Sequence, residues 1–246
     1  IRTLKKKYGE TIEEVVRYGQ ELQSKLDLLT HSEERTGELQ AEIESLDARV
    51  MAEAEDLSSL RQKGGSAFTK SVERELESLG MPNAVLRVAQ GRKELDSSGI
   101  DSIEFLISAN PGEPPRPLAK IASGGEISRI MLAIKSVMAA VDCMPTLIFD
   151  EIDVGVGGRT AAVIGDKLNC LAKNSQVLCI THLPQIACNP GRHFAIEKQL
   201  LDGRTVVRVR ELSDEERVSE LARMLGGADP SATAIQHARE MLGQNA

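Results

Sequence analysis

The feature that most constrains the fold is a long proline-free stretch near the start of the chain, over residues 4–60. Charged residues are dense in it, and apolar residues recur three or four positions apart, as the core positions of a coiled coil do. These apolar residues are Tyr8, Ile12, Val15, Leu22, Leu26, Leu29, Leu39, Ile43, Leu46, Val50 and Leu57. A helix of that length would extend well beyond a small globular domain, because each residue adds about 1.5 Å. The stretch therefore predicts one strand of an antiparallel coiled-coil arm.

Two places interrupt this apolar pattern. The polar residues 30–37 break the register, and the arm is either interrupted or bent there. Gly64 and Gly65 are expected to end the arm, and a short amphipathic helix is expected after them. The apolar face of that helix is formed by Phe68, Val72, Leu76 and Leu79. We therefore divide the chain into an arm at residues 1–63 and a globular lobe at residues 64–246.

The globular lobe is expected to be an α/β structure. Two strand candidates, at residues 84–89 and 102–108, precede a stretch in which helices and short apolar strands alternate. The later strands are expected at residues 146–149, 176–181, 194–197 and 205–209, and the helices at residues 126–141, 159–172, 214–225 and 231–242. Short, continuously apolar strands between helices indicate a parallel sheet covered on both faces.

The charge balance restricts how the chain could contact nucleic acid. A net charge of -7 and a pI near 5.3 argue against a general basic nucleic-acid binder, so any DNA contact must be local. The densest basic stretch contains Arg2, Lys5, Lys6 and Lys7, and a solvated helix face explains it at least as well.

The cysteines and the apolar runs indicate the compartment. Cys143, Cys170, Cys179 and Cys188 form no CxxC pair, and there is no signal peptide or long apolar segment. A cytoplasmic protein with reduced thiols and no membrane contact is expected. A metal site formed by Cys179, His182 and Cys188 is conceivable, but their spacing matches no standard zinc pattern.

Three short segments could carry chemistry. Ser123-Gly124-Gly125-Glu126 directly precedes an apolar helix, where free backbone amides can hold a phosphate, although the same S-x-x-E spacing also describes a capping box. Asp150 and Glu151 follow an apolar strand; one carboxylate could hold hydrated Mg²⁺ and the other could activate water. His182 follows the next apolar strand, at the same edge of the sheet, where it could contact a terminal phosphate.

Each segment alone has an ordinary structural explanation: a helix cap, an acidic turn, or a histidine at a strand end. Their order is more specific, because they follow one another at intervals of roughly 25 to 30 residues, as alternating helices and strands require.

In this order the segments resemble the motifs of ABC ATPases. Residues 122–126 match the signature loop, residues 148–150 the end of the Walker B strand, and Glu151 the catalytic glutamate. Asp153 matches the D-loop and His182 the switch histidine. The RecN family of SMC-like ATPases is an even closer match in sequence, in residues 121–129, 149–155, 179–187 and 222–227. The predicted architecture is thus the C-terminal half of an ABC-type ATPase head carrying a coiled-coil arm.

One motif of the family pattern is absent. No P-loop G-x-x-x-x-G-K-[ST] occurs, and the glycines at 155, 157 and 158 are followed by Arg159 and Thr160 without the required lysine. In the RecN family the P-loop lies in the N-terminal half, so the resemblance implies that this chain is inactive alone and needs that half as a partner.

The resemblance also implies a mechanism and partners. Two heads would enclose ATP and Mg²⁺, with Ser123, Gly124, Gly125 and Glu126 of one head capping the γ-phosphate held by the other. Homodimers through heads and coiled coils would act on DNA ends or single-stranded regions in double-strand break repair, in the bacterial cytoplasm at the nucleoid. Asn110 and Arg129 are further candidates for contact with the nucleotide or the opposing head.

Alternative readings are an SMC-type or Rad50-type head fragment and, from a different class, a non-enzymatic coiled-coil scaffold. The intact pair Asp150 and Glu151 argues against the scaffold, which has no need for both acids.

Overall fold

A computed structural model describes residues 2–121, 123–142, 144–201 and 204–243. Ala122 of the expected signature loop and Cys143 lie outside the described residues. The chain divides into two compact units, residues 1–61 with 93–100 and residues 62–92 with 101–246. Each unit is described by itself.

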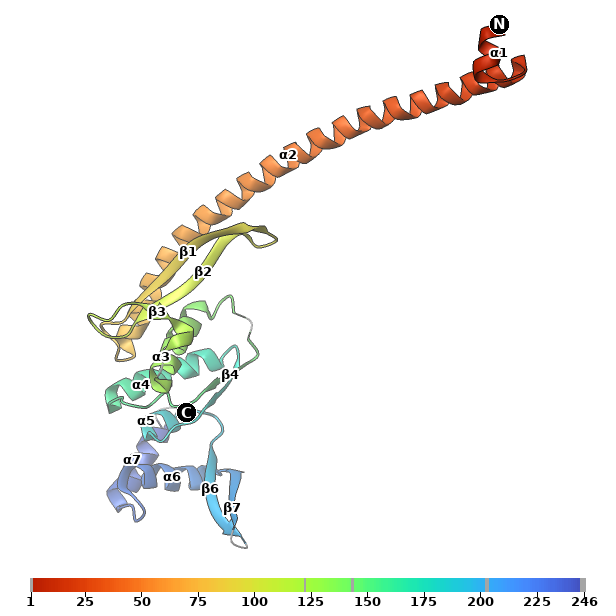
Figure 1. The fold of residues 1–246 in the computed structure, drawn as a ribbon. Coiled ribbons are helices and arrows are strands. Elements are labelled where there is room, and N and C mark those ends of the chain that lie inside the picture. Colours follow the sequence, from red (N-terminus) through yellow and green to blue (C-terminus); the bar gives the residue numbers. More distant parts are fainter. Residues whose placement is uncertain (1, 122, 143, 202–203, 244–246) are drawn as a thin grey trace. The chain divides into compact units, whose positions relative to one another are not determined.

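The first unit contains α1 (Arg2–Tyr8) and most of α2 (Ile12–Ser78) (Figure 1). The helical stretch expected from residue 4 is divided at a place that was not expected, because the chain leaves the helix at residues 9–11. A capping box starts the second helix: Glu14 N donates to Thr11 Oγ1 at 3.2 Å, and the Glu14 carboxylate accepts from Thr11 N at 3.3 Å. Tyr8 and Tyr18 stack across the break, with ring centroids 5.4 Å apart.

Helix α2 does not end at Gly64 and Gly65, and it is not interrupted at residues 30–37. A glycine inside a helix costs about 1 kcal/mol relative to alanine. That cost is smaller than the gain from burying the apolar face that follows, where Val72 and Leu76 are fully buried. In the polar stretch, Thr30 and Thr36 satisfy their hydroxyl groups by donating to carbonyls one turn earlier, which the helix tolerates.

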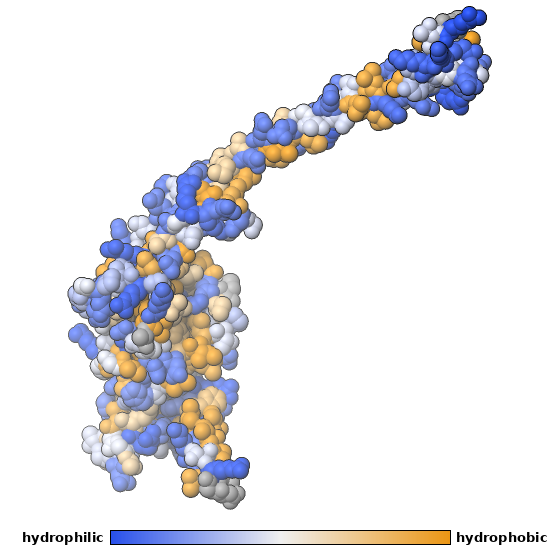
Figure 2. Space-filling view, viewed as in Figure 1, coloured by the Kyte–Doolittle hydropathy of each residue, from blue (hydrophilic) through white to orange (hydrophobic). Residues whose placement is uncertain are grey.

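Most of the large apolar residues of the arm are exposed, including Leu26, Leu29 and Ile43. Figure 2 shows orange, hydrophobic surface among blue along this helix. The long N-terminal helix of the predicted fold class is confirmed. The predicted antiparallel pairing with a second helix stays a prediction.

Strands β1 (Val85–Asp96), β2 (Gly99–Ser108) and β3 (Arg116–Pro117) form one sheet in that order. The two predicted strands are confirmed, and both are longer than expected. At the turn between them, Ser98 N and Oγ each donate to Asp96 Oδ1 at 2.7 Å, and Gly99 adopts φ +95°. A 3₁₀ turn, η1 (Leu118–Lys120), then leads toward the signature-like segment.

The second unit is built on a parallel pair of strands, β4 (Thr146–Phe149) and β5 (Gln176–Cys179). Helices α3 (Gly124–Met138), α4 (Gly158–Ala172) and α5 (Pro184–Ala187) belong to the same unit (Figure 1). Leu147 and Phe149 are buried in its core, together with the C-terminal part of α2. The parallel sheet of the predicted α/β class is therefore confirmed.

The expectation that this sheet is covered on both faces is wrong for the described residues. The alternate side chains of the two strands are open to solvent: Ile148 is 70% exposed, Leu178 46% and Ile180, just beyond β5, 49%. Side chains alternate between the two faces of a strand, so these three line the face opposite the core.

The chain continues with an antiparallel pair, β6 (Phe194–Leu201) and β7 (Arg204–Glu211). Helices α6 (Asp214–Gly226) and α7 (Ala232–Gly243) follow and form a smaller apolar cluster with Ala187 and Cys188. All four elements were predicted, the strands with shorter bounds. Among the described residues, no helix combines the length and the apolar character needed to cross a membrane.

Candidate functional site

The signature-like segment forms the start of α3. Ser123 is the N-cap residue, and its side chain accepts a hydrogen bond from Glu126 N at 3.4 Å. Gly124 and Gly125 are the first helical residues, so the helix begins with two residues that have no side chain. The capping explanation and the phosphate-binding explanation are compatible here, because a cap satisfies only part of the free amides of a helix N-terminus.

The two glycines allow the loop after β4 to lie directly against this helix start. A Cβ on Gly124 would lie 2.0 Å from Glu151 Oε2. A Cβ on Gly125 would lie 3.0 Å from the Glu151 carbonyl oxygen and 3.1 Å from Val154 Cβ. The structure thus brings the signature-like segment and the predicted catalytic glutamate of the same chain into contact.

Asp150 and Glu151 follow β4 and are both exposed. Asp150 Oδ1 accepts a hydrogen bond from Glu151 N at 2.9 Å. Glu151 adopts φ +55°, the only positive φ of a non-glycine residue in the described part of the chain. Such a conformation is uncommon for an L-residue and is characteristic of functional sites.

Asp153 has a different environment from its two acidic neighbours, because its side chain is only 3% exposed. Its Oδ2 accepts hydrogen bonds from Thr181 Oγ1 at 2.5 Å and from His182 N at 2.8 Å. His182 Nδ1 lies 2.9 Å from the same oxygen, and the His182 side chain is 72% exposed. The structure therefore joins the predicted D-loop and the predicted switch histidine directly.

Helix α3 is joined to the same loop by two further hydrogen bonds. Ser128 Oγ donates to the Asp150 carbonyl at 2.6 Å, and Arg129 Nη1 donates to the Val154 carbonyl at 2.8 Å. Arg129 is buried, and burial lowers the pKa of its guanidinium. The sequence reasoning did not single out Ser128 or Thr181 for a role, although both lie inside the quoted motifs.

The two further candidates, Asn110 and Arg129, make hydrogen bonds within this chain. Arg129 binds the loop after β4, as described above, and Asn110 Nδ2 donates to Glu113 Oε1 at 3.3 Å within its own loop. Both had been suggested as contacts of the nucleotide or the opposing head, but no motif defined which of these partners either residue would bind.

The cysteines near the site are poorly suited to a metal. Burial, and then the nearby carboxylates of Asp153 and Asp150, raise the pKa of Cys179 to about 12, and burial raises the pKa of Cys188. Thiolates, not thiols, bind metals. In the described residues no group of three or more His, Cys, Asp and Glu side chains could hold a metal ion. The exposed carboxylate of Asp150 fits a different kind of metal, since Mg²⁺ often uses one or two carboxylates with phosphate oxygens and water.

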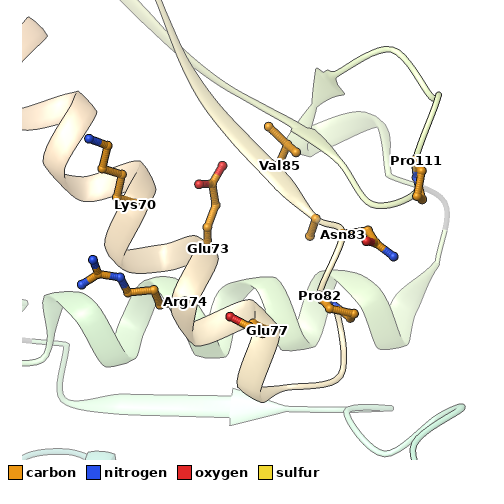
Figure 3. Close-up of a pocket in the computed structure, with 9 residues that line it drawn as sticks. Lys70, Glu73, Arg74, Glu77, Pro82, Asn83, Val85 and Pro111 are labelled. Carbon is orange, nitrogen blue, oxygen red and sulfur yellow. The ribbon is translucent and has the colours of Figure 1, made fainter.

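A separate hollow of about 600 Å³ lies between the C-terminal part of α2 and the start of β1 (Figure 3). Its lining mixes Lys70, Glu73, Arg74 and Glu77 with the turn residues Pro82 and Asn83. Glu73 already accepts a hydrogen bond from Leu86 N at 3.0 Å. The lining contains none of the predicted site residues, so we place the candidate site at the ends of β4 and β5 instead.

Comparison with curated proteins identifies the family. The chain is 39% identical over 247 residues to DNA repair protein RecN of Halalkalibacterium halodurans, covering 98% of this chain and 44% of that protein. It is 42% identical to DNA repair protein RecN of Treponema pallidum, again over 98% of this chain and 44% of that protein. The chain belongs to the RecN family. It spans less than half of the length of these RecN relatives.

Other comparisons add little. No protein-family model matches the chain. One similar solved structure is the Smc head domain with a coiled coil and joint derived from Pyrococcus yayanosii, with 23% identity and a TM-score of 0.44 over 94% of this chain and 38% of that one. Membership of RecN therefore depends on sequence similarity along nearly the whole chain, which includes every predicted motif.

Proposed function

We propose that this RecN chain is the C-terminal half of a DNA-repair ATPase head, made of a coiled-coil arm at residues 1–63 and a head lobe at residues 64–246. The lobe would supply the signature, Walker B, D-loop and H-loop segments to a head-to-head ATP sandwich. The observation that carries the proposal is the convergence of these segments at one edge of the β4–β5 sheet.

The residues at this edge have chemically distinct roles in the proposal. Mg²⁺ would neutralise charge on the transferred phosphoryl group, and the exposed Asp150 would hold it through water. Glu151 would orient and deprotonate the attacking water, and His182 would contact the γ-phosphate.

The start of α3 would act on the nucleotide of the opposing head. Ser123 and the amides of Gly124 and Gly125 would bind its γ-phosphate, with the partial positive charge of the helix N-terminus adding to the attraction. Glu126 would belong to the same segment that caps this γ-phosphate. Asp153 would belong to the D-loop.

The absent P-loop and the open face of the sheet support a head completed by another part of RecN. Parallel sheets are normally covered on both faces, yet Ile148, Leu178 and Ile180 are exposed here. We propose that the P-loop half covers this face and that the chain alone hydrolyses no ATP.

The arm supports the partners proposed for the whole protein. Its exposed stripe of leucine and isoleucine is suited to pairing with a second helix, antiparallel within one molecule. Dimers formed through heads and arms would hold DNA ends or single-stranded regions in the bacterial cytoplasm at the nucleoid, and hydrolysis would separate the heads.

The test is ATP hydrolysis by this chain mixed with the P-loop half of RecN, with and without linear DNA. Wild-type mixtures should turn over ATP, and the Glu151→Gln mixture should bind ATP without hydrolysing it. If an assembled mixture binds ATP but shows no Mg²⁺-dependent turnover with wild-type sequence, the chain is a scaffold and the proposal fails.

A further inference from the structure

The short helix α1 is held in a defined place beside the start of α2 (Figure 1). Gly9 N donates to the Lys5 carbonyl at 3.2 Å, where α1 ends. A Cβ on Gly9 would lie 2.6 Å from Glu14 Cβ, so the turn lies directly against the first turn of α2. The stacked rings of Tyr8 and Tyr18 join the two helices across this turn. The side chains of α1 therefore form a surface with a fixed position on the arm.

That surface carries positive charge of one sign. The helix has no acidic residue, and its cations are Arg2, Lys5, Lys6 and Lys7. All of them are exposed except Lys5, which is half-buried. In the described part of the chain none of the four forms an ion pair, although Lys7 Nζ lies 5.2 Å from the centroid of the Tyr8 ring.

An ordinary solvated helix face mixes the two signs of charge, often in pairs three or four residues apart. Arg35 and Glu38 form such a pair on α2. At the start of α2, the Glu14 carboxylate accepts from Glu10 N and Thr11 N, so it caps that helix and does not neutralise α1. The cations of α1 thus differ from those of a solvated face in being left without compensation.

The helix that follows α1 has the opposite charge. Residues 10–57 contain fourteen Asp and Glu residues but four Lys and Arg residues. A polyanion is repelled by such a surface and attracted to α1. On this strand of the arm, contact with a polyanion is therefore restricted to α1.

The dimensions and composition of α1 favour DNA as that polyanion. Seven residues of helix are about 10 Å long, and duplex DNA presents one negative charge for about every 1.7 Å, so several phosphates lie within reach. A membrane surface would require an apolar face on the same helix. The apolar residues of α1 are Leu4 and Tyr8, and the Tyr8 ring is already stacked on Tyr18.

We propose that Arg2, Lys5, Lys6 and Lys7 of α1 bind the phosphate backbone of duplex DNA without reading its sequence. The choice of DNA as the partner rests on the function proposed above. The contact itself requires no ATP, because α1 contains none of the candidate site residues.

The first experiment measures binding of the 246-residue chain to a fluorescent linear duplex by anisotropy, without nucleotide, at salt concentrations from about 50 to 200 mM. The α1 variant combines Lys5→Gln, Lys6→Gln and Lys7→Gln, which keep good helix formers. Each lost phosphate contact lowers the slope of log Kd against log salt by about 0.9. We expect the slope to fall by about 2–3 and the affinity at about 50 mM salt to fall at least tenfold.

The matched control removes the same charge from exposed positions of α2, by combining Arg17→Gln, Lys25→Gln and Arg49→Gln. Its affinity should stay within about twofold of wild type, because charges more than about 10 Å away are largely screened. Equal losses in the two variants would show a general effect of net charge and would overturn the proposal. A wild-type chain that does not bind the duplex would also overturn it. So would a chain whose α1 cations hold together two copies, seen as a drop in mass by light scattering of the α1 variant without a change in the salt slope.

The second experiment uses the wild-type chain, so it decides even if the α1 variant does not fold. Lysine acetylation read by mass spectrometry should slow at Lys5, Lys6 and Lys7 when the duplex is added, and stay unchanged at Lys25 on α2. Unchanged acetylation at all four lysines overturns the proposal.

In complete RecN, the α1 variant should lose the same part of the salt slope and keep the ATP hydrolysis measured without DNA. An unchanged slope there would overturn the proposal. Complete RecN without any ATPase activity would instead refute the proposed function, and the DNA measurements on α1 would still stand.

Discussion

Replacing Glu151 with glycine is expected to stabilise the chain. The residue adopts φ +55°, where an L-residue is destabilised by roughly 1–2 kcal/mol and glycine is not. Its exposed carboxylate accepts no hydrogen bond from any residue in the described part of the chain, so truncation to glycine removes no hydrogen bond to this carboxylate. Glycine loses about 0.5–1 kcal/mol more conformational entropy on folding. The difference predicts a net gain of about 0.5–1 kcal/mol for Glu151→Gly.

The assay is urea unfolding of the chain followed by circular dichroism, with Glu151→Gln as the matched control. Glutamine keeps the length and the strained backbone, so the Gln variant should stay within about 0.5 kcal/mol of wild type. Both variants should lose turnover in complete RecN. If Glu151→Gly is no more stable than Glu151→Gln, the positive φ stores no strain and the reasoning fails.

Three further predictions concern neighbouring positions. Gly125→Ala should destabilise the chain by about 1–3 kcal/mol in urea unfolding, because its Cβ would press on the loop backbone. Gly124→Ala should destabilise the chain less, because its Cβ would meet a carboxylate that can move. Equal losses of stability in the two variants would contradict this. Ile148→Lys should leave the stability of the chain within about 0.5 kcal/mol and prevent co-purification with the P-loop half; normal assembly would show that this face stays open. The pKa of Cys179 is raised from 9.0 to about 12, so the unfolded state loses the thiol proton first and stability should fall as pH rises between these values. Cys179→Ala should remove that part of the decline in a pH series of unfolding midpoints.

The sequence predicted elements best where local pattern and tertiary packing agree. Strand β4 was predicted with its observed bounds because a threonine and three apolar residues stand between a proline and two acids. The end of the helix at Gly64 was predicted wrongly, because the local cost of glycine was weighed without the burial of Val72 and Leu76 that extends α2. The sequence does contain a signal for the break at residues 9–11, which is the capping box of Thr11 and Glu14. It was missed because the apolar spacing continues across the break.

The candidate site was predictable in its location and not in its internal geometry. The ends of parallel strands meet at one edge of a sheet, so the order of the motifs was enough to bring Asp150 and His182 to the same region. Nothing in the sequence distinguishes the environments of three acids within four residues. Burial of Asp153 depends on the path of the loop, and that path includes the positive φ of Glu151.

The contacts around the site also indicate what the P-loop half does not need to supply. Asp153 joins the loop after β4 to the segment after β5, while Ser128 and Arg129 join α3 to the same loop. Each of these hydrogen bonds lies within the chain, and the residues that make them are adjacent to the proposed catalytic groups. A site held by such a network has its donors and acceptors oriented before substrate binds, which is the condition for electrostatic stabilisation of a transition state. The P-loop half would therefore contribute nucleotide binding and cover for the open sheet face, and the geometry of the acids and the histidine would already be set by this half of the head.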